Sequence, residues 1–225
     1  MKILIALIFT FVFGLKCFAQ PEVINDAAIW TGVEFSKKIN KKNIISITQQ
    51  CRFDENISQL GRISVGIDAI YKLNKNFKIN YGYNYLRKID RNMSYFNENR
   101  VLLGFSAKIS LRKFDFSYRN IAQIRYKQYL TSEDGKIPKV YNRNRIAIQY
   151  EINKRISLAN SYEIYIPLNK TEIIEINRLR SIADLNFKLS KKTSLKSYFL
   201  FQTQFHTDEL IERKYVYGIE FSHEL

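Results

Sequence analysis

Arginines that recur on the polar side of alternating segments are the residues of this sequence whose chemistry suggests a site. Arginine keeps its proton and carries five N–H donors, so unpaired arginines in a low-dielectric interior attract anions strongly. If the alternating segments enclose a lumen, these arginines form a collar near one mouth. The collar arginines are Arg52, Arg62, Arg100, Arg125, Arg145, Arg178 and Arg180. The collar predicts a narrow, anion-favouring pore that takes a small anionic solute.

A second interpretation of the same collar is that loop carboxylates neutralise it and fold the loops over the mouth. The acids available for this are Asp54, Glu55, Glu98, Glu133, Asp134, Glu172, Glu175, Asp208 and Glu209. Of the acids expected to point inward, Glu163 is the one in the same upper part as the collar. Because barrels of this size leave little empty interior, a closed structural barrel remains the alternative to a pore.

Candidates for catalysis are few, so we expect no enzyme. A nucleophilic serine would need a histidine within hydrogen-bond reach, and the two histidines are His206, close in sequence to Asp208, and His223. An outer-membrane lipase or acyltransferase is the enzymatic alternative, with His206 as its best candidate. No spacing of His, Cys or carboxylates suggests a metal or another cofactor. Cys51 is expected to be an apolar surface residue.

The elements that must position these side chains are about eleven segments of roughly ten residues with a period of two, which indicates β-strands. In residues 62–73, Ile63, Val65 and Ile67 share one face, and Arg62 and Asp68 lie on the other. The aromatics expected on the apolar face are Tyr81, Tyr83, Tyr85, Phe114, Phe116, Tyr215 and Tyr217.

The connections between these segments alternate in length and charge. Short basic turns occur near residues 37–38, 74–76, 112–113, 153–155 and 191–192, whereas longer connections hold most of the remaining acids. Short periplasmic turns with longer extracellular loops are typical of an up-and-down antiparallel transmembrane β-barrel. Outer-membrane lipid and lipopolysaccharide are then the expected surroundings, and Arg87, which faces outward near the rim, is a candidate for contact with lipopolysaccharide phosphates.

A soluble periplasmic β-sandwich or a lipocalin-like binding protein is the main alternative, because one-sided strands also serve a soluble core. The placement of glycine argues against it. The glycines at positions 32, 66, 82, 104 and 218 all fall on the polar face, where a narrow barrel needs small residues. A soluble core would not sort glycine onto its solvent face.

The formal net charge of +15 raises the question of nucleic acid, since lysine and arginine bind phosphate. Much of this charge lies in short turns rather than in one patch, and no nucleic-acid-binding motif accompanies it. We therefore expect no nucleic-acid partner. A chain with 46% hydrophobic and 14% aromatic residues has enough apolar side chains for a folded domain.

The first residues have the three parts of a secretory signal. Lys2 precedes an apolar run at residues 3–13, and Ala19 ends a segment suited to cleavage. The run is shorter than the roughly 20 residues that a membrane-spanning helix needs. We therefore expect a cleaved signal peptide at residues 1–19 and an outer-membrane barrel at residues 20–225.

Short motifs at both ends of the expected barrel carry a family resemblance. The last segment contains Tyr217-Gly218-Ile219-Glu220-Phe221, which resembles the terminal strand recognised by the outer-membrane assembly machinery, although the chain ends on Leu225 rather than on an aromatic residue. Together with Ile29-Trp30-Thr31-Gly32-Val33 and residues 175–180, it makes the chain similar to the family called domain of unknown function 2490. The resemblance implies a small outer-membrane barrel and no known catalytic residue.

The number of strands is expected to lie between 10 and 12. Bacterial single-chain barrels have an even number of strands. The eleven segments counted in the sequence therefore predict ten or twelve strands in the wall.

Overall fold

The structure is a computed structural model that describes residues 22–89, 94–127, 138–169, 176–207 and 210–225. The signal peptide expected at residues 1–19 lies outside these ranges. The strands of the described part are β1 (Glu22–Lys38), β2 (Asn43–Asp54), β3 (Gln59–Lys72), β4 (Phe77–Ile89), β5 (Tyr95–Leu111), β6 (Phe114–Lys127), β7 (Lys139–Glu151), β8 (Ile156–Pro167), β9 (Arg178–Lys188), β10 (Thr193–Thr207) and β11 (Leu210–Glu224). No helix in these ranges has the length and apolar character needed to cross a membrane.

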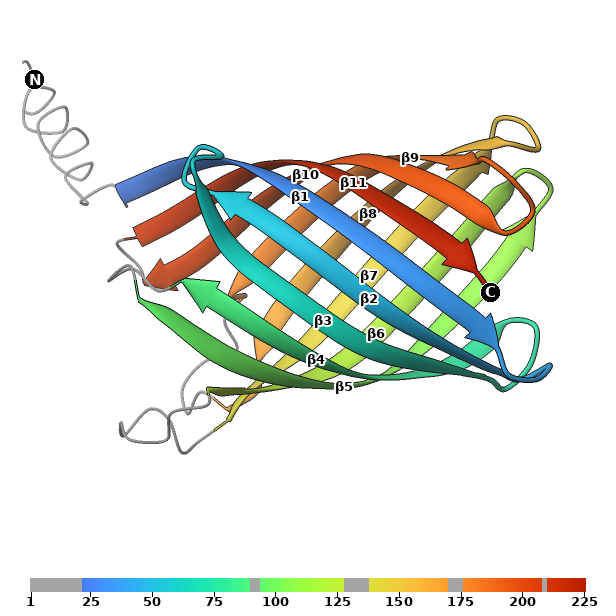
Figure 1. Cartoon of the computed structure of the whole chain (residues 1–225), viewed down its shortest axis with the longest axis horizontal. Helices are drawn as coiled ribbons and strands as arrows, with labels where there is room; N and C mark the ends of the chain where they lie inside the picture. Colours follow the sequence, from blue (N-terminus) through green and yellow to red (C-terminus); the bar gives the residue numbers. More distant parts are fainter. Residues whose placement is uncertain (1–21, 90–93, 128–137, 170–175, 208–209) are drawn as a thin grey trace, which may run out of the picture.

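The strands form one closed barrel in which each strand pairs with its neighbours in sequence (Figure 1). All consecutive pairs, from β1–β2 to β10–β11, are antiparallel. The short turns gather at one end of the barrel, with the C-terminus, and the longer connections gather at the other end, where β1 begins. The prediction of an all-β, up-and-down barrel with 10 to 12 strands is confirmed.

The expectation of an even strand number is wrong, because the described chain has eleven strands in the wall. With an odd number, the first and last strands run in the same direction. The barrel therefore closes through a parallel pairing of β1 with β11, whose register runs from Glu22 beside Leu210 to Ser36 beside Glu224. The sequence pattern gave the number of alternating segments correctly but could not show that the closing pair is parallel.

The two faces of the strands are sorted as the period of two predicts. Large apolar side chains point outward and are exposed on every side of the barrel, including Ile67 (54%), Leu103 (59%), Ile146 (59%) and Phe199 (51%). The seven aromatics expected on this face, among them Tyr81 and Tyr217, are exposed as well. The outer wall is thus apolar, while charged and amide side chains fill the interior.

Glycines on the inward face allow neighbouring strands and side chains to approach closely. A Cβ atom on Gly104 of β5 would lie 2.4 Å from the backbone oxygen of Asn120 on β6. A Cβ atom on Gly218 of β11 would lie 2.0 Å from Cζ of Tyr198, whose ring occupies that space. These contacts confirm that a narrow, crowded interior places glycine on this face.

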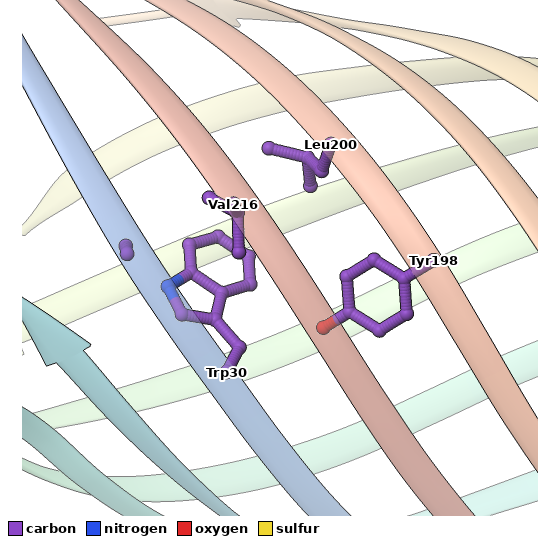
Figure 2. Close-up of a cluster of buried hydrophobic side chains, with 5 residues drawn as sticks. Trp30, Tyr198, Leu200 and Val216 are labelled. Atoms are coloured by element: carbon purple, nitrogen blue, oxygen red, sulfur yellow. The ribbon is translucent and has the colours of Figure 1, made fainter. Parts of the chain in front are cut away.

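A small apolar cluster lines the interior beside the parallel closure. The cluster contains Trp30 from β1, Val216 from β11, and Tyr198 and Leu200 from β10 (Figure 2). None of these four side chains is more than 6% exposed. Ala28 completes the cluster. A parallel ladder is slightly less stable per residue than an antiparallel one. Burial of these apolar side chains therefore adds stability at the parallel pair of β1 and β11.

Candidate functional site

A cavity of about 670 Å³ lies inside the barrel at the end that carries the longer connections. Five of the seven predicted collar arginines line it, and they come from β2, β3, β6 and β9. These five are Arg52, Arg62, Arg125, Arg178 and Arg180. Strands far apart in sequence meet here because the barrel closes on itself, so the structure brings most of the collar to one place.

Trp30 forms part of the cavity wall and faces two of these arginines. Trp30 and Arg52 are neighbours across the β1–β2 pairing, and the Arg52 guanidinium carbon lies 3.5 Å from the centre of the indole ring. The Arg180 guanidinium carbon lies 5.6 Å from the same ring. The ring face attracts both cations. The sequence predicts Trp30 only as part of the family motif at residues 29–33 and not as a site residue. Its inward position in the alternation of β1 was the signal that could have placed it in the cavity wall.

Three cavity arginines have an amide contact or an unbonded Nε atom instead of an ion pair with a carboxylate. Arg52 donates from Nε to Oε1 of Gln50 at 2.7 Å, and Arg178 donates to Oε1 of Gln204. The Nε atoms of Arg62 and Arg178 are buried without a hydrogen-bond partner. Within the described ranges, none of the three arginines forms an ion pair with a protein carboxylate. Buried N–H groups without acceptors are costly, so this wall favours an added anion.

Glu98 is the carboxylate partner of three inward cations on β4, β5 and β6. Its carboxylate lies 2.5 Å from Nε of Arg100, 3.4 Å from Nε of Arg125 and 3.5 Å from Nζ of Lys88. The prediction that Glu98 lies in a loop is wrong, because β5 begins at Tyr95 and Glu98 is a buried inward residue of that strand. A loop carboxylate was expected to pair with the collar, and here a strand carboxylate does so.

Glu163 of β8 is the centre of a second ion-pair cluster. It is 3% exposed and lies 2.8 Å from Arg143, 3.4 Å from Arg119 and 3.5 Å from Arg180. The Tyr165 hydroxyl donates to its other oxygen at 3.0 Å. Sequence reasoning placed Glu163 correctly in the upper interior but omitted Arg119 and Arg143 from the collar. Both lie on the inward parity of their strands, so the alternation was sufficient to find them.

Lys214 of β11 organises the acids at the rim of the cavity. Its Nζ atom lies 2.8 Å from Asp26, 2.9 Å from Asp54 and 3.4 Å from Glu212. Asp54 therefore pairs with a lysine rather than with the collar. Glu55, another loop acid predicted to pair with the collar, is exposed beside the cavity. The other six loop acids lie outside the described residues. These six are Glu133, Asp134, Glu172, Glu175, Asp208 and Glu209.

Each of the two histidines contacts a side chain in the described ranges. Nε2 of His206 lies 2.8 Å from Oε2 of Glu212, and Nδ1 of His223 lies 3.0 Å from Oγ1 of Thr193. Asp208, the predicted neighbour of His206, lies outside the described residues. No group of three or more His, Cys, Asp or Glu side chains in those ranges could hold a metal ion.

The remaining predicted residues lie outside the cavity wall. Arg100 points inward but binds Glu98, and Arg145 lies between Arg119 and Glu163 in the strand register. Arg87 faces outward, with its guanidinium carbon 5.3 Å from the ring centre of Tyr95. Cys51 is a free cysteine on the outward parity of β2.

Side chains from several strands are buried in the interior, and carboxylates become frequent towards the short turns. Leu86, Gln123, Ser161 and Val216 are fully buried and come from four strands spread around the barrel. Nearer the short turns a second cavity of about 190 Å³ includes Glu34 and Glu220 in its lining. The inward acids of this half are Glu34, Asp68, Asp115, Glu151, Asp184 and Glu220, of which Asp115 is paired with Lys108 and Glu220 with Lys196. The interior thus contains a large arginine-lined cavity at one end and a smaller cavity with two carboxylates nearer the other.

Comparison with known proteins adds a family and two distant solved structures. The outer-membrane expressed OmpT of Vibrio cholerae is 7% identical with a TM-score of 0.39, and the match covers 79% of this chain and 61% of that one. The translocator domain of autotransporter NalP from Neisseria meningitidis is 9% identical with a TM-score of 0.43, covering 78% of this chain and 72% of that one. This chain therefore spans less than two thirds of the length of the first.

These likenesses are too weak to establish a shared fold, so the barrel assignment rests on the strand pairing itself. No protein with a curated description matches the chain. The family model described as a protein of unknown function, DUF2490, matches residues 27–212, which include the five cavity arginines and most of the barrel wall. The chain belongs to the DUF2490 family.

Proposed function

We propose that the protein is an integral outer-membrane barrel that binds a small, multiply charged anion in its arginine-lined cavity. The single observation that carries the anion proposal is that Arg52, Arg62 and Arg178 line a cavity without a carboxylate partner in the described ranges. The chemistry of the donors favours carboxylates or phosphates, which accept several guanidinium hydrogen bonds at once.

The membrane location is supported by the outer wall. Large apolar side chains are exposed on all sides of the barrel, and water would meet far more contiguous apolar surface than a soluble monomer tolerates. A bilayer removes this penalty, and a closed barrel leaves no unpaired strand edge in the hydrocarbon. Export behind the predicted signal peptide, with residues 20–225 forming the mature barrel, belongs to the same proposal.

Binding, rather than passage, is the role that the interior supports. An anion that left the arginine-lined cavity would meet side chains buried from several strands, and beyond them a second cavity whose charged lining residues are Glu34 and Glu220, the latter paired with Lys196. Carboxylates in a confined space repel anions. We therefore propose a barrel closed at mid-height, with the anion-selective pore as the alternative.

The membrane proposal is tested by fractionating cells that produce the full chain. We expect the protein in the outer-membrane fraction, and we expect the unheated protein to migrate faster on a gel than the heated protein, as a folded barrel does. Recovery of a monomer in periplasmic extract without detergent would overturn the membrane location and favour the soluble alternative.

The anion proposal can be tested with the protein's own reporter, because Trp30 is the one tryptophan of the chain and it faces the cavity. Titration of the detergent-solubilised protein with pyrophosphate or citrate should change the Trp30 fluorescence and saturate. Arg62→Gln and Arg178→Gln should each weaken the affinity about tenfold, since a hydrogen bond to a charged group contributes about 1.5–3 kcal/mol.

The matched control is Arg119→Gln, which also removes an inward positive charge but lies outside the cavity lining. It should leave the affinity within about twofold of the unaltered protein, because long-range charge effects are modest and screened by salt. Equal losses in all three variants would show that the cavity is not the binding site. A steady anion-selective conductance in planar bilayers would instead favour the pore.

A further inference from the structure

Four of the five short turns repeat one local design. Each begins with an apolar residue, continues with Asn or Ser and then Lys, and ends on a polar residue. The four turns are Ile39-Asn40-Lys41-Lys42, Leu73-Asn74-Lys75-Asn76, Ile152-Asn153-Lys154-Arg155 and Leu189-Ser190-Lys191-Lys192. They connect β1–β2, β3–β4, β7–β8 and β9–β10, and all lie at the same end of the barrel (Figure 1).

The second residue of each turn fixes the backbone. The Asn40 side-chain oxygen accepts hydrogen bonds from the backbone nitrogens of Lys42 and Asn43 at 2.9 and 2.8 Å. Asn153 does the same for Arg155 and Ile156 at 2.8 and 2.9 Å.

Asn74 and Ser190 make the equivalent pairs of bonds in the other two turns. In every case the first residue of the turn also donates its backbone N–H to the residue four positions later, at 3.0–3.1 Å. Side-chain bonds of this kind hold a turn in one conformation.

The repeated geometry presents the same two side chains four times. The first residue of each turn faces outward and is exposed, with values of 54% for Ile39, 48% for Leu73, 45% for Ile152 and 60% for Leu189. The lysine two positions later is exposed at the turn itself in all four cases. The remaining turn, at Arg112-Lys113, has no Asn or Ser, but it also places a lysine two positions after an exposed apolar residue, Leu111.

Among the residues that the structure describes, the four repeated lysines form no ion pair with a carboxylate. None of the five turns contains an acid, and the nearby Glu224 is bonded to Lys38, outside the repeated positions. Glu151 points to the interior, and Asp115 is bonded to Lys108 and Ser110. The lysines at positions 41, 75, 154 and 191 therefore remain available to an external anion.

We propose that these four turns bind the phosphate groups of anionic phospholipids in the leaflet at the short-turn end of the barrel. The outward apolar residue of each turn continues the apolar wall to its lower edge, and the adjacent lysine extends from there to the level of the headgroups. A lysine in this position buries its aliphatic stem against apolar surface, and its ammonium group is attracted to the phosphate layer. Both interactions stabilise it. This inference rests on the membrane location proposed above.

The test compares headgroup selectivity in vesicles. The full chain is folded into phosphatidylcholine vesicles that contain a trace of spin-labelled phosphatidylglycerol or spin-labelled phosphatidylcholine, and electron paramagnetic resonance measures how much of each label the protein immobilises. We expect the protein to prefer phosphatidylglycerol about fivefold at low salt, the factor that one lysine near an anionic surface contributes. Added salt should reduce the preference.

The decisive variant carries Lys41→Gln, Lys75→Gln, Lys154→Gln and Lys191→Gln, which leave the Asn and Ser bonds in place. It should lose the preference while it keeps the gel mobility of the folded barrel. The control carries Arg87→Gln, Lys127→Gln, Lys139→Gln and Arg213→Gln, four exposed cations at the opposite end, and should keep the preference.

Three outcomes would overturn the inference: no preference for phosphatidylglycerol in the unaltered protein, an unchanged preference in the turn variant, or an equal loss in the control. They differ from failure of the membrane proposal, in which the chain would not enter vesicles or the outer-membrane fraction at all.

Discussion

Thr31 of β1 lies beside Ile219 of β11 in parallel register and, on its other side, beside Cys51 of β2 in antiparallel register. All three side chains are on the outward parity of their strands. Thr31 therefore lies on β1 between its antiparallel neighbour β2 and its parallel neighbour β11, the pair that an odd number of strands requires. The closing pair is also the place where the apolar cluster around Trp30 and Val216 packs on the inner side.

The parallel closure predicts which cysteine pairs can cross-link. Thr31→Cys combined with Ile219→Cys, in a chain with Cys51→Ser, should form a disulfide in the folded barrel, because neighbouring strands bring Cα atoms within disulfide range. Non-reducing gel mobility measures it. Thr31→Cys with the native Cys51 is the positive control, and it should cross-link β1 to β2.

The register provides the negative control for the same experiment. Thr31→Cys with Phe221→Cys is displaced by two residues along β11 and should cross-link poorly. If this displaced pair formed a disulfide as readily as the pair with position 219, the parallel register would be wrong.

Glu163→Gln should strongly destabilise the barrel. The carboxylate is buried between Arg143, Arg119 and Arg180, and an amide would leave these guanidinium groups without a counter-charge. Removing one partner of a buried ion pair costs about 3–5 kcal/mol. Guanidinium chloride unfolding in detergent micelles, followed by Trp30 fluorescence, measures the free energy of unfolding.

The exposed Glu55→Gln is the control for this change in charge and should alter stability by less than about 1 kcal/mol. Added sulfate should restore part of the stability lost in Glu163→Gln, because an anion can replace the missing carboxylate. A Glu163→Gln protein as stable as the unaltered chain would contradict the assignment of this residue as the counter-charge.

Gly104→Ala should cost about 1–3 kcal/mol, the usual cost of overpacking an interior. The added methyl group would meet the backbone oxygen of Asn120 at 2.4 Å, and a backbone in a paired strand cannot move aside cheaply. Gly32→Ala is the matched comparison, since its methyl group would meet only the flexible Glu220 side chain at 3.2 Å. Unfolding midpoints of the two variants measure the difference, and equal costs would refute the explanation.

Arg112→Asn should stabilise the turn between β5 and β6. Arg112 has a φ of 55°, a left-handed conformation that asparagine adopts more readily than arginine. The expected gain in the free energy of unfolding is about 1 kcal/mol, at the low end of the cost of such a conformation. Lys113→Asn is the control, because Lys113 does not have a positive φ and should gain nothing. A loss of stability in Arg112→Asn would show that the arginine side chain outweighs the strain.

The alternation of the sequence was sufficient to predict the class of fold, the two faces of each strand and the side of the wall on which glycine lies. Strand geometry sends successive side chains to opposite faces, so a period of two carries this information locally. The same local parity placed Arg52, Arg62, Arg178 and Arg180 inside, and it would have placed Arg143 and Trp30 there had it been applied to every strand.

Partnerships between distant residues were decided by the tertiary structure alone. Which arginines meet a carboxylate depends on strand register and on where each strand begins, and Glu98 illustrates this because the strand starts before it rather than after it. The parallel closure is of the same kind, since it joins residues nearly two hundred positions apart. Side-chain periodicity is a property of one strand, whereas register and closure arise from the pairing of all eleven, so the sequence by itself determined the wall and the tertiary structure determined the site.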